Sequence, residues 1–243
     1  MTRLTSCPDE EAVAERAASH VQRELERAVG ERGNVHLALS GGTTPGRTYE
    51  LLGERVADWA GVEIWFADER CVPPEDEQSN YRLVDRTLLG RARIPHGRVH
   101  RMQGELGPEE GARRYAAELL ERVPRGGSDQ PMPPALDLIL LGIGPDGHVA
   151  SLFPGAPTLT AGMDAVCLPV HDAPKPPPER ITLSLAVLRA ARGCLVLATG
   201  GGKADAVNAM LGEPTPHVPA SLLRRERLTV IVDDAASPTG PVR

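Results

Sequence analysis

Short runs of almost wholly apolar residues recur along this chain, and most are followed by a loop and then by a segment with helical periodicity. A strand with one face in water alternates apolar and polar residues, so runs without alternation predict strands buried on both faces. Such strands separated by helices predict an α/β fold, a mainly parallel sheet with helices on both faces. The runs lie at 35–39, 62–67, 136–141, 194–199 and 228–232.

Weaker patterns fill the rest of the chain. Strands are also expected at 99–102 and 165–170, and 181–191 begins extended and ends helical. Apolar residues three or four positions apart predict further helices, at 9–29, 80–89, 108–123 and 203–211. The chain shows no internal repeat and no boundary for a second domain. We therefore expect one domain over 1–243, with a loop at 124–134 and a flexible tail at 234–243.

Charge and composition limit the partners of the protein. Its 27 basic and 33 acidic side chains give a net charge of -6 without a basic block. That balance argues against a nucleic-acid or anionic membrane surface, while a locally positive pocket for a small anion is compatible with it. No apolar run approaches the length of a membrane helix, about 20 residues.

The N-terminus and the cysteines indicate a cytoplasmic protein. Residues 1–15 are acidic and lack the apolar stretch of a signal peptide. The four cysteines, Cys7, Cys71, Cys167 and Cys194, are far apart and form no C-x-x-C pair. We expect reduced thiols and no metal site.

Loops at the carboxyl ends of the strands are where an α/β sheet binds ligands. The first, at 40–46, has Ser40, Gly41, Gly42 and Thr43 ahead of a helix, where glycines and free N–H groups suit an anion. A tight strand-to-helix turn would look the same, and neither a P-loop nor a dinucleotide spacing is present. The second follows the run at 62–67 and holds Asp68 and Arg70, which form either a charged cluster at the sheet edge or a solvated turn.

A third loop follows the most apolar run and places three glycines, Asp146 and His148 within seven residues. Imidazole can accept a proton near neutral pH, so His148 is a candidate general base. Asp146 is close enough in sequence to orient it. Ser151 lies nearby, but the G-x-S-x-G pattern of a serine hydrolase is absent.

The fourth loop, Gly200 to Lys203, again joins a strand to a helix. Only Lys175 and Lys203 are lysines among the 27 basic residues, so Lys203 at a helix start is a candidate phosphate contact. Lys175, in a proline-rich loop, is expected to be merely exposed. Arg180 precedes a strand-like segment and is a further possible anion contact.

Together these motifs resemble the 6-phosphogluconolactonase family, within the glucosamine-6-phosphate isomerase/deaminase superfamily. The resemblance covers roughly residues 10–235, and G-x-G-x-D-G-H followed by ASLFPG is its most specific part. The deaminase branch has a different, Asn-containing stretch after the histidine. The matching stretches are LALSGGTTP (37–45), WFADERCVP (65–73), SNYRL (79–83), LDLILLGIGPDGHVASLFPG (136–155), RITLSL (180–185), LVLATGGGKADAV (195–207) and VPASLL (218–223).

The resemblance implies a Rossmann-like fold and hydrolysis of 6-phosphoglucono-δ-lactone to 6-phosphogluconate in the pentose phosphate pathway, without a cofactor. His148 would be the general base, Asp146 would orient it, and Asp68 is the second acid–base candidate. Substrate and phosphate contacts would come from Ser40, Gly41, Gly42, Thr43, Arg70, Arg180 and Lys203. Two alternatives stay open: a glucosamine-6-phosphate isomerase/deaminase and a non-catalytic sugar-phosphate sensor. The expected partner is the phosphosugar lactone alone, with the chain a monomer or small homo-oligomer.

Overall fold

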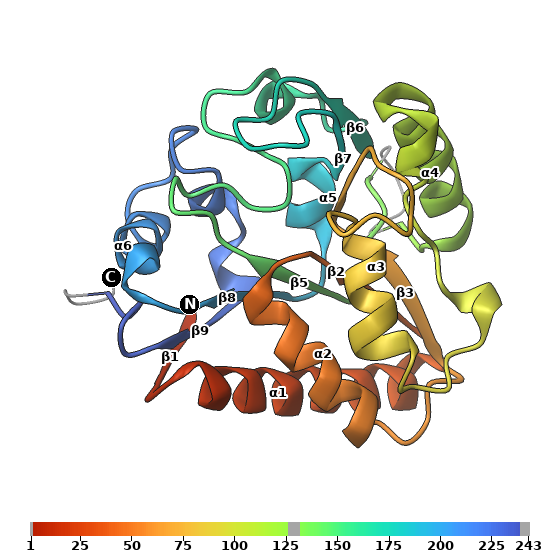
Figure 1. Ribbon diagram of the computed structural model, residues 1–243, viewed down its shortest axis with the longest axis horizontal. Helices are drawn as coiled ribbons and strands as arrows, with labels where there is room; N and C mark the ends of the chain where they lie inside the picture. The colour runs from red at the N-terminus through yellow and green to blue at the C-terminus, as the bar shows by residue number, and fades with distance from the viewer. Residues whose placement is uncertain (1, 126–131, 239–243) are drawn as a thin grey trace.

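The computed structural model describes residues 2–125 and 132–238 and contains a six-stranded sheet in which all strands are parallel (Figure 1). This confirms the α/β class expected from the apolar runs. The strands, in their order across the sheet, are β1 (Arg3–Cys7), β9 (Leu228–Asp233), β8 (Cys194–Ala198), β5 (Leu138–Gly142), β2 (Val35–Leu39) and β3 (Val62–Phe66).

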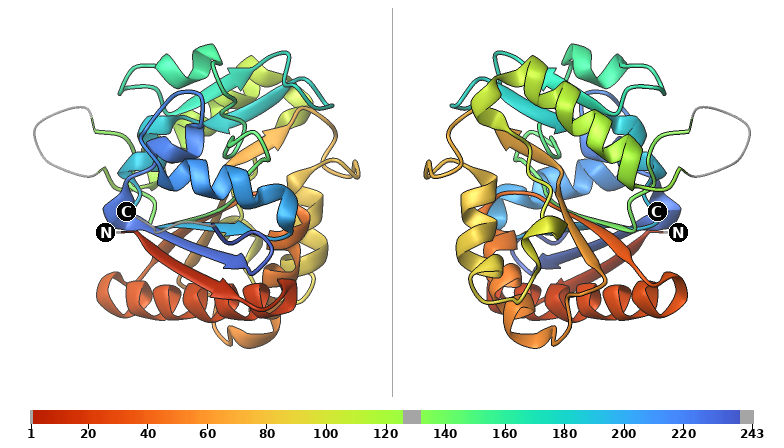
Figure 2. Two further views of the ribbon diagram at one scale, coloured as in Figure 1. Left: turned by 90° about the vertical axis from the view of Figure 1, so that its left-hand side faces the viewer. Right: turned by 90° about the vertical axis from the view of Figure 1, so that its right-hand side faces the viewer.

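The central strands are the apolar runs of the sequence. All five residues of β2 and of β8 are buried, because helices cover both faces of the sheet. Figure 2 shows α1 on one side of the sheet and α6 on the other. The helices are α1 (Glu10–Arg32), α2 (Thr43–Arg55), α3 (Asn80–Val84), α4 (Pro108–Arg122), α5 (Leu185–Ala190) and α6 (Ala204–Leu211).

The ends of α1 follow directly from its sequence. Asp9 precedes the helix, and its carboxylate accepts a hydrogen bond from the N–H of Ala12 at 2.8 Å, which satisfies one of the free donors of the first turn. Gly33 ends the helix in the left-handed conformation, with φ of 78°, and its N–H bonds the carbonyl of Val29.

A second, antiparallel sheet was not expected. It consists of β4 (Asp68–Arg70), β7 (Arg180–Leu183) and β6 (Cys167–Val170), in that order. The charged segment after β3 is therefore a strand rather than a loop, because its backbone pairs with β7, so that Arg70 lies opposite Arg180. This pairing joins segments more than 100 residues apart, which local sequence patterns do not report.

Some expected elements differ in the structure. Strand β1 was missed, since its five residues at the sheet edge are mostly polar and only Cys7 is buried. Residues 99–102 form no strand, and Val99 makes only a single bridge to Ile64. The helix expected at 80–89 is α3 followed by a π-helical turn at 85–89.

The expected loop at 124–134 and the expected tail at 234–243 lie partly outside the described residues. Residues 126–131 of the loop and 239–243 of the tail are not described. Within the tail, Ala236 is buried and donates its N–H to Asp233. In the described part of the chain, no helix is both long and apolar enough to span a membrane.

Candidate active site

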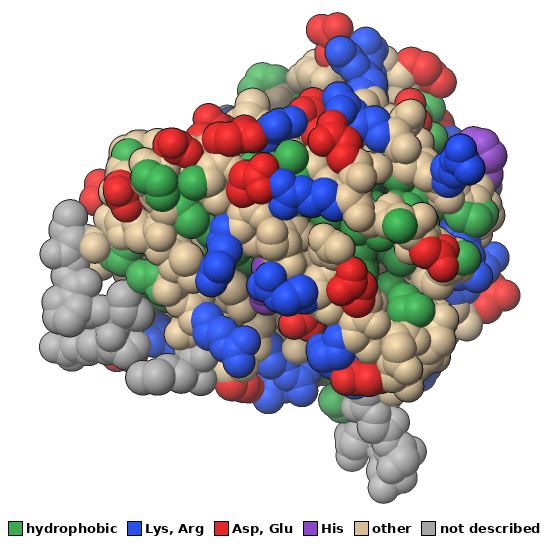
Figure 3. Space-filling view, turned by 90° about the horizontal axis from the view of Figure 1, so that it is seen from below, with side chains coloured by type: hydrophobic (Ala, Val, Ile, Leu, Met, Phe, Trp, Pro, Cys, Tyr) green, Lys and Arg blue, Asp and Glu red, His purple; other side chains and the backbone are tan. Residues whose placement is uncertain are grey.

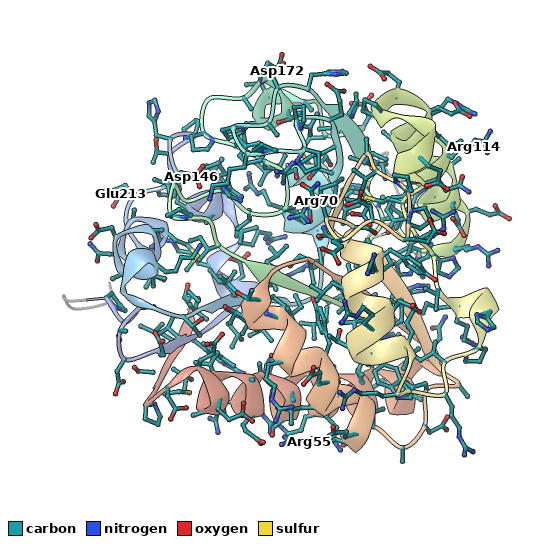
Figure 4. The ribbon with its side chains drawn as sticks, viewed as in Figure 1. Arg55, Arg70, Arg114, Asp146, Asp172 and Glu213 are labelled. Carbon is teal, nitrogen blue, oxygen red and sulfur yellow. The ribbon has the colours of Figure 1, made fainter. Side chains whose placement is uncertain are left out.

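A cavity of about 290 Å³ opens where β2, β5 and β8 end and where β4 meets β7. Figure 4 labels two residues of this region, Arg70 and Asp146, above the sheet. Of the ten site residues expected from the sequence, all but Asp146 line the cavity. They are Ser40, Gly41, Gly42, Thr43, Asp68, Arg70, His148, Arg180 and Lys203.

The loop at 40–44 brings the end of β2 against the end of β5. The Ser40 hydroxyl accepts the N–H of Gly142 at 3.2 Å, so it also has a structural role in joining the two strand ends. Gly41 lies against Asn80, where a Cβ would come within 1.9 Å of the amide oxygen of that side chain. Only glycine fits here, and the backbone of the loop can therefore form the wall of the cavity.

In the charged strand β4, Glu69 points into the protein and Asp68 faces the cavity. Glu69 is buried and accepts the N–H groups of Asn80 and Tyr81 at 2.7 and 2.8 Å, so it supports the start of α3. Asp68 faces the cavity and is 5% exposed. Its carboxylate accepts from the Ser151 hydroxyl at 2.7 Å and from the Asn80 amide at 3.1 Å.

His148 and Asp146 form a close pair, with 2.5 Å between His148 Nδ1 and Asp146 Oδ1. Burial lowers the pKa of His148, although the carboxylates of Asp146 and Asp68 oppose the shift and Lys175 adds to it. Burial raises the pKa of Asp146, but the charge and hydrogen bonds of His148 outweigh burial and hold that pKa below its ordinary value. Asp146 thus remains a carboxylate within hydrogen-bond distance of the imidazole.

Gly144 makes room for this pair. A Cβ at this position would lie 2.1 Å from His148 Nδ1 and 2.4 Å from Asp146 Oδ1. We expect Gly144→Ala to push the imidazole away, to lower kcat, and to cost about 1–3 kcal/mol of stability, as overpacking does. Denaturant unfolding and steady-state kinetics would measure both effects. The same change at Gly97, where a Cβ meets nothing within 4 Å, is the control; equal kcat for the two variants would contradict the expectation.

Four cations line the cavity, and none forms an ion pair with any residue that the structure describes. Backbone carbonyls hold three of them: Arg70 bonds Gln78 at 2.5 Å, Arg180 bonds Lys175 at 2.7 Å, and Lys203 bonds Ile143 at 2.7 Å. The fourth cation is Lys175 itself. Burial and then Arg70 lower the pKa of Arg180, while burial and then Lys175 lower the pKa of Lys203.

Elsewhere, basic side chains are commonly neutralised. Arg47, for example, pairs with Glu11 and Glu50. On the face seen from below, basic and acidic side chains lie interspersed (Figure 3). The cavity is different, because its cations form no ion pair with a described carboxylate, although Asp68 acts on Arg180 and Asp146 on Lys203 from a greater distance. An anion can bind there without displacing a carboxylate partner.

Among the cavity residues that the reasoning from sequence did not assign to the site, three have side chains that could act on a ligand or on its contacts. Lys175 is exposed as expected, but its loop also brings it to the cavity. Asn80 and Phe153 line the cavity too. The scarcity of lysine was a signal for Lys175, and Asn80 and Phe153 lie in the stretches SNYRL and ASLFPG that carry the family resemblance. In the described ranges, no three His, Cys, Asp or Glu side chains gather as a metal site requires.

Comparison with known proteins decides the family. Residues 8–232 match the family model described as glucosamine-6-phosphate isomerases/6-phosphogluconolactonase. The 6-phosphogluconolactonase of Rattus norvegicus is 36% identical over 93% of this chain and 85% of its own length. That of Streptomyces coelicolor is also 36% identical, over 94% and 91%. The chain belongs to the 6-phosphogluconolactonase family.

Solved structures of the family agree with this assignment. A 6-phosphogluconolactonase from Leishmania guyanensis superposes with a TM-score of 0.85 at 29% identity, covering 97% of each chain. The one from Thermotoga maritima gives 0.82 at 29% identity, covering 96% of this chain and 99% of its own. A monomeric glucosamine-6-phosphate deaminase also matches, at 0.79, but its 21% identity indicates only a shared fold.

Proposed function

We propose that this protein hydrolyses 6-phosphoglucono-δ-lactone to 6-phosphogluconate, the reaction for which its relatives are named. The observation that carries the proposal is one cavity lined by His148, which contacts the neighbouring Asp146, and by four cations that form no ion pair with any described residue. An anionic sugar ester fits this combination, since the cations bind its phosphate and the histidine activates water against its carbonyl.

The cations supply binding. A phosphate monoester carries a charge of about -1.5 to -2 at pH 7, and hydrogen bonds to charged groups are the stronger ones in proteins. Arg180 and Lys203 are candidates for direct contact because carbonyls fix them at the cavity wall. The backbone at Gly41 to Thr43, ahead of α2, would add N–H donors. Lys175 would reach the substrate from its exposed loop.

The His148–Asp146 pair supplies the base. A carboxylate at Nδ1 selects the tautomer in which Nδ1 carries the proton, which leaves Nε2 as the acceptor. Burial disfavours the charged imidazolium and so lowers the pKa of His148, which keeps the imidazole neutral to lower pH. Asp68, held by Ser151 and Asn80, would face the substrate hydroxyls or help stabilise the imidazolium.

The reaction then needs one water and no covalent intermediate. The water oxygen attacks C1 as His148 Nε2 takes a proton from it, and the lactone carbonyl oxygen becomes an oxyanion. When the carbonyl re-forms, the bond between C1 and the ring oxygen breaks, and the imidazolium returns the proton to that oxygen. The products are a C5 hydroxyl and a carboxylic acid, which ionises and releases one proton to solvent.

A direct assay tests this function. Purified protein should accelerate acid release from the lactone at mildly acidic pH, where spontaneous hydrolysis is slow. The unphosphorylated glucono-δ-lactone is the matched substrate and should react much more slowly, because it lacks the anion. Ammonia release from glucosamine 6-phosphate without lactone hydrolysis would overturn the proposal in favour of the deaminase branch.

Activity should not depend on a metal. The proposed steps use only side chains and water, so dialysis against a chelator should leave kcat and KM unchanged. Atomic emission analysis of the dialysed sample would verify that metals had been removed. Loss of activity that zinc or magnesium restores would contradict this expectation.

A further inference from the structure

Phe153 occupies a position between two chemically different parts of the cavity. Its ring centroid lies 4.8 Å from that of His148, with the two planes at 51°, and 5.5 Å from the guanidinium carbon of Arg180. The side chain is 5% exposed and lines the cavity with both neighbours. One aromatic ring thus contacts the candidate base and a candidate phosphate ligand.

The local backbone explains this placement. After His148 the chain reverses in a turn closed by the N–H of Leu152 on the carbonyl of Val149, at 3.0 Å. Ala150 in this turn has a positive φ of 49°. The reversal returns Phe153 to the histidine that precedes the turn, while β7 delivers Arg180 from a distant part of the sequence.

We propose that Phe153 is a positioning residue, which holds the His148 imidazole and the Arg180 guanidinium in place without adding a charge beside either. This inference rests on the proposed function. A carboxylate at 153 would fix Arg180 equally well but would neutralise it, and the cavity would lose part of its affinity for an anion. The π face of phenylalanine attracts a cation and leaves its charge available.

The same ring covers one side of His148. Apolar cover removes water from the imidazole and so favours the neutral form that accepts a proton. The charged groups that act on His148 are Asp146 from its own loop, Asp68 from β4 and Lys175 from the loop before β7. The two carboxylates favour the imidazolium, so the burial to which Phe153 contributes is what keeps the base neutral at lower pH.

The substitutions Phe153→Leu and Phe153→Ala separate the contact with Arg180 from the apolar cover of His148. Phe153→Leu keeps apolar cover over His148 but loses the π face that contacts Arg180. KM should therefore rise about 2- to 30-fold, the equivalent of a cation–π contact. The acid limb of the pH profile, the fall of kcat/KM as His148 becomes protonated at low pH, should stay in place. Phe153→Ala loses both, so KM should rise similarly and the acid limb should move to higher pH. Phe153→Tyr keeps the ring and should restore KM to near the wild-type value.

Controls distinguish positioning from folding. Trp59 is also a buried aromatic but does not line the cavity, so Trp59→Leu should lower thermal stability without changing KM or the acid limb. NMR titration of the His148 ring needs no turnover and should show a higher pKa in Phe153→Ala. If wild-type protein hydrolyses no lactone, the proposed function fails and this titration still tests Phe153. An unchanged His148 titration in Phe153→Ala, or unchanged KM in the Leu and Ala variants, would overturn the inference.

Discussion

Replacing His148 with alanine should lower kcat by about 10²- to 10⁴-fold, the usual contribution of a general base. Without the imidazole, water must attack C1 with no group to take its proton. KM should change little, because the four cations of the cavity are untouched. Initial rates of acid release over a range of lactone concentrations give both constants, after subtraction of spontaneous hydrolysis.

The control for this variant is His96→Ala, since His96 is exposed and does not line the cavity. It should behave like the wild-type protein. Asp68→Asn tests the other acid–base candidate. Near-wild-type turnover in His148→Ala together with an inactive Asp68→Asn would transfer the role of base to Asp68.

The pH profile of the wild-type protein provides an independent test of His148. The base works as neutral imidazole, so activity should fall as pH drops through its pKa. Burial lowers that pKa, and the acid limb should therefore lie below about 6.5, the ordinary value for histidine. In the variant His148→Ala, residual activity should lose this limb. An acid limb that remains would assign the titration to another group.

Replacing Lys203 with alanine should weaken substrate binding by roughly 10- to 150-fold, because a hydrogen bond to a charged group is worth about 1.5–3 kcal/mol. Lys203 has no carboxylate partner among the described residues, so its removal takes positive charge directly from the cavity. The effect should appear in KM more than in kcat. Inhibition by inorganic phosphate, measured in the wild-type protein and the variant, should weaken in parallel.

An exposed arginine is the matched control for this loss of charge. Arg93 is exposed and lies outside the cavity, so Arg93→Ala changes the net charge by the same amount and should leave KM unchanged. Equal KM values for the two variants would show that Lys203 is not a substrate contact. A reduced kcat with unchanged KM would instead place Lys203 near the reacting carbon.

The candidate site could be predicted in large part from sequence because its residues lie in loops that directly follow apolar runs. Carboxyl ends of parallel strands meet at one edge of a sheet, so Ser40, His148 and Lys203 were expected to converge from separate segments. His148 and Lys203 each follow a glycine, so they could be recognised as candidate site residues before any contact was known. The pairing of His148 with Asp146 was also accessible, since only one residue separates them.

Other features required the folded chain. Asp68 to Arg70 was expected to be a loop, either a charged cluster at the sheet edge or a solvated turn, yet it is a strand, because its hydrogen-bonding partner is β7 more than 100 residues away. Glu69, between Asp68 and Arg70, supports the start of α3. Lys175 looked like an ordinary exposed residue. The partner of β4 lies more than 100 residues away and the partners of Glu69 lie 11 and 12 residues away, so no short local pattern encodes either.

The sequence by itself determined the α/β class, since apolar runs without alternation, separated by helical segments, predict parallel strands buried between two layers of helices. It also predicted which loops line the cavity, since glycine, histidine and lysine stand where those strands end. Only the tertiary structure decided the second sheet, the lack of an ion pair between the four cations and any described residue, and the contact of Phe153 with both His148 and Arg180. These depend on contacts between segments far apart in the chain, which form when the core is packed.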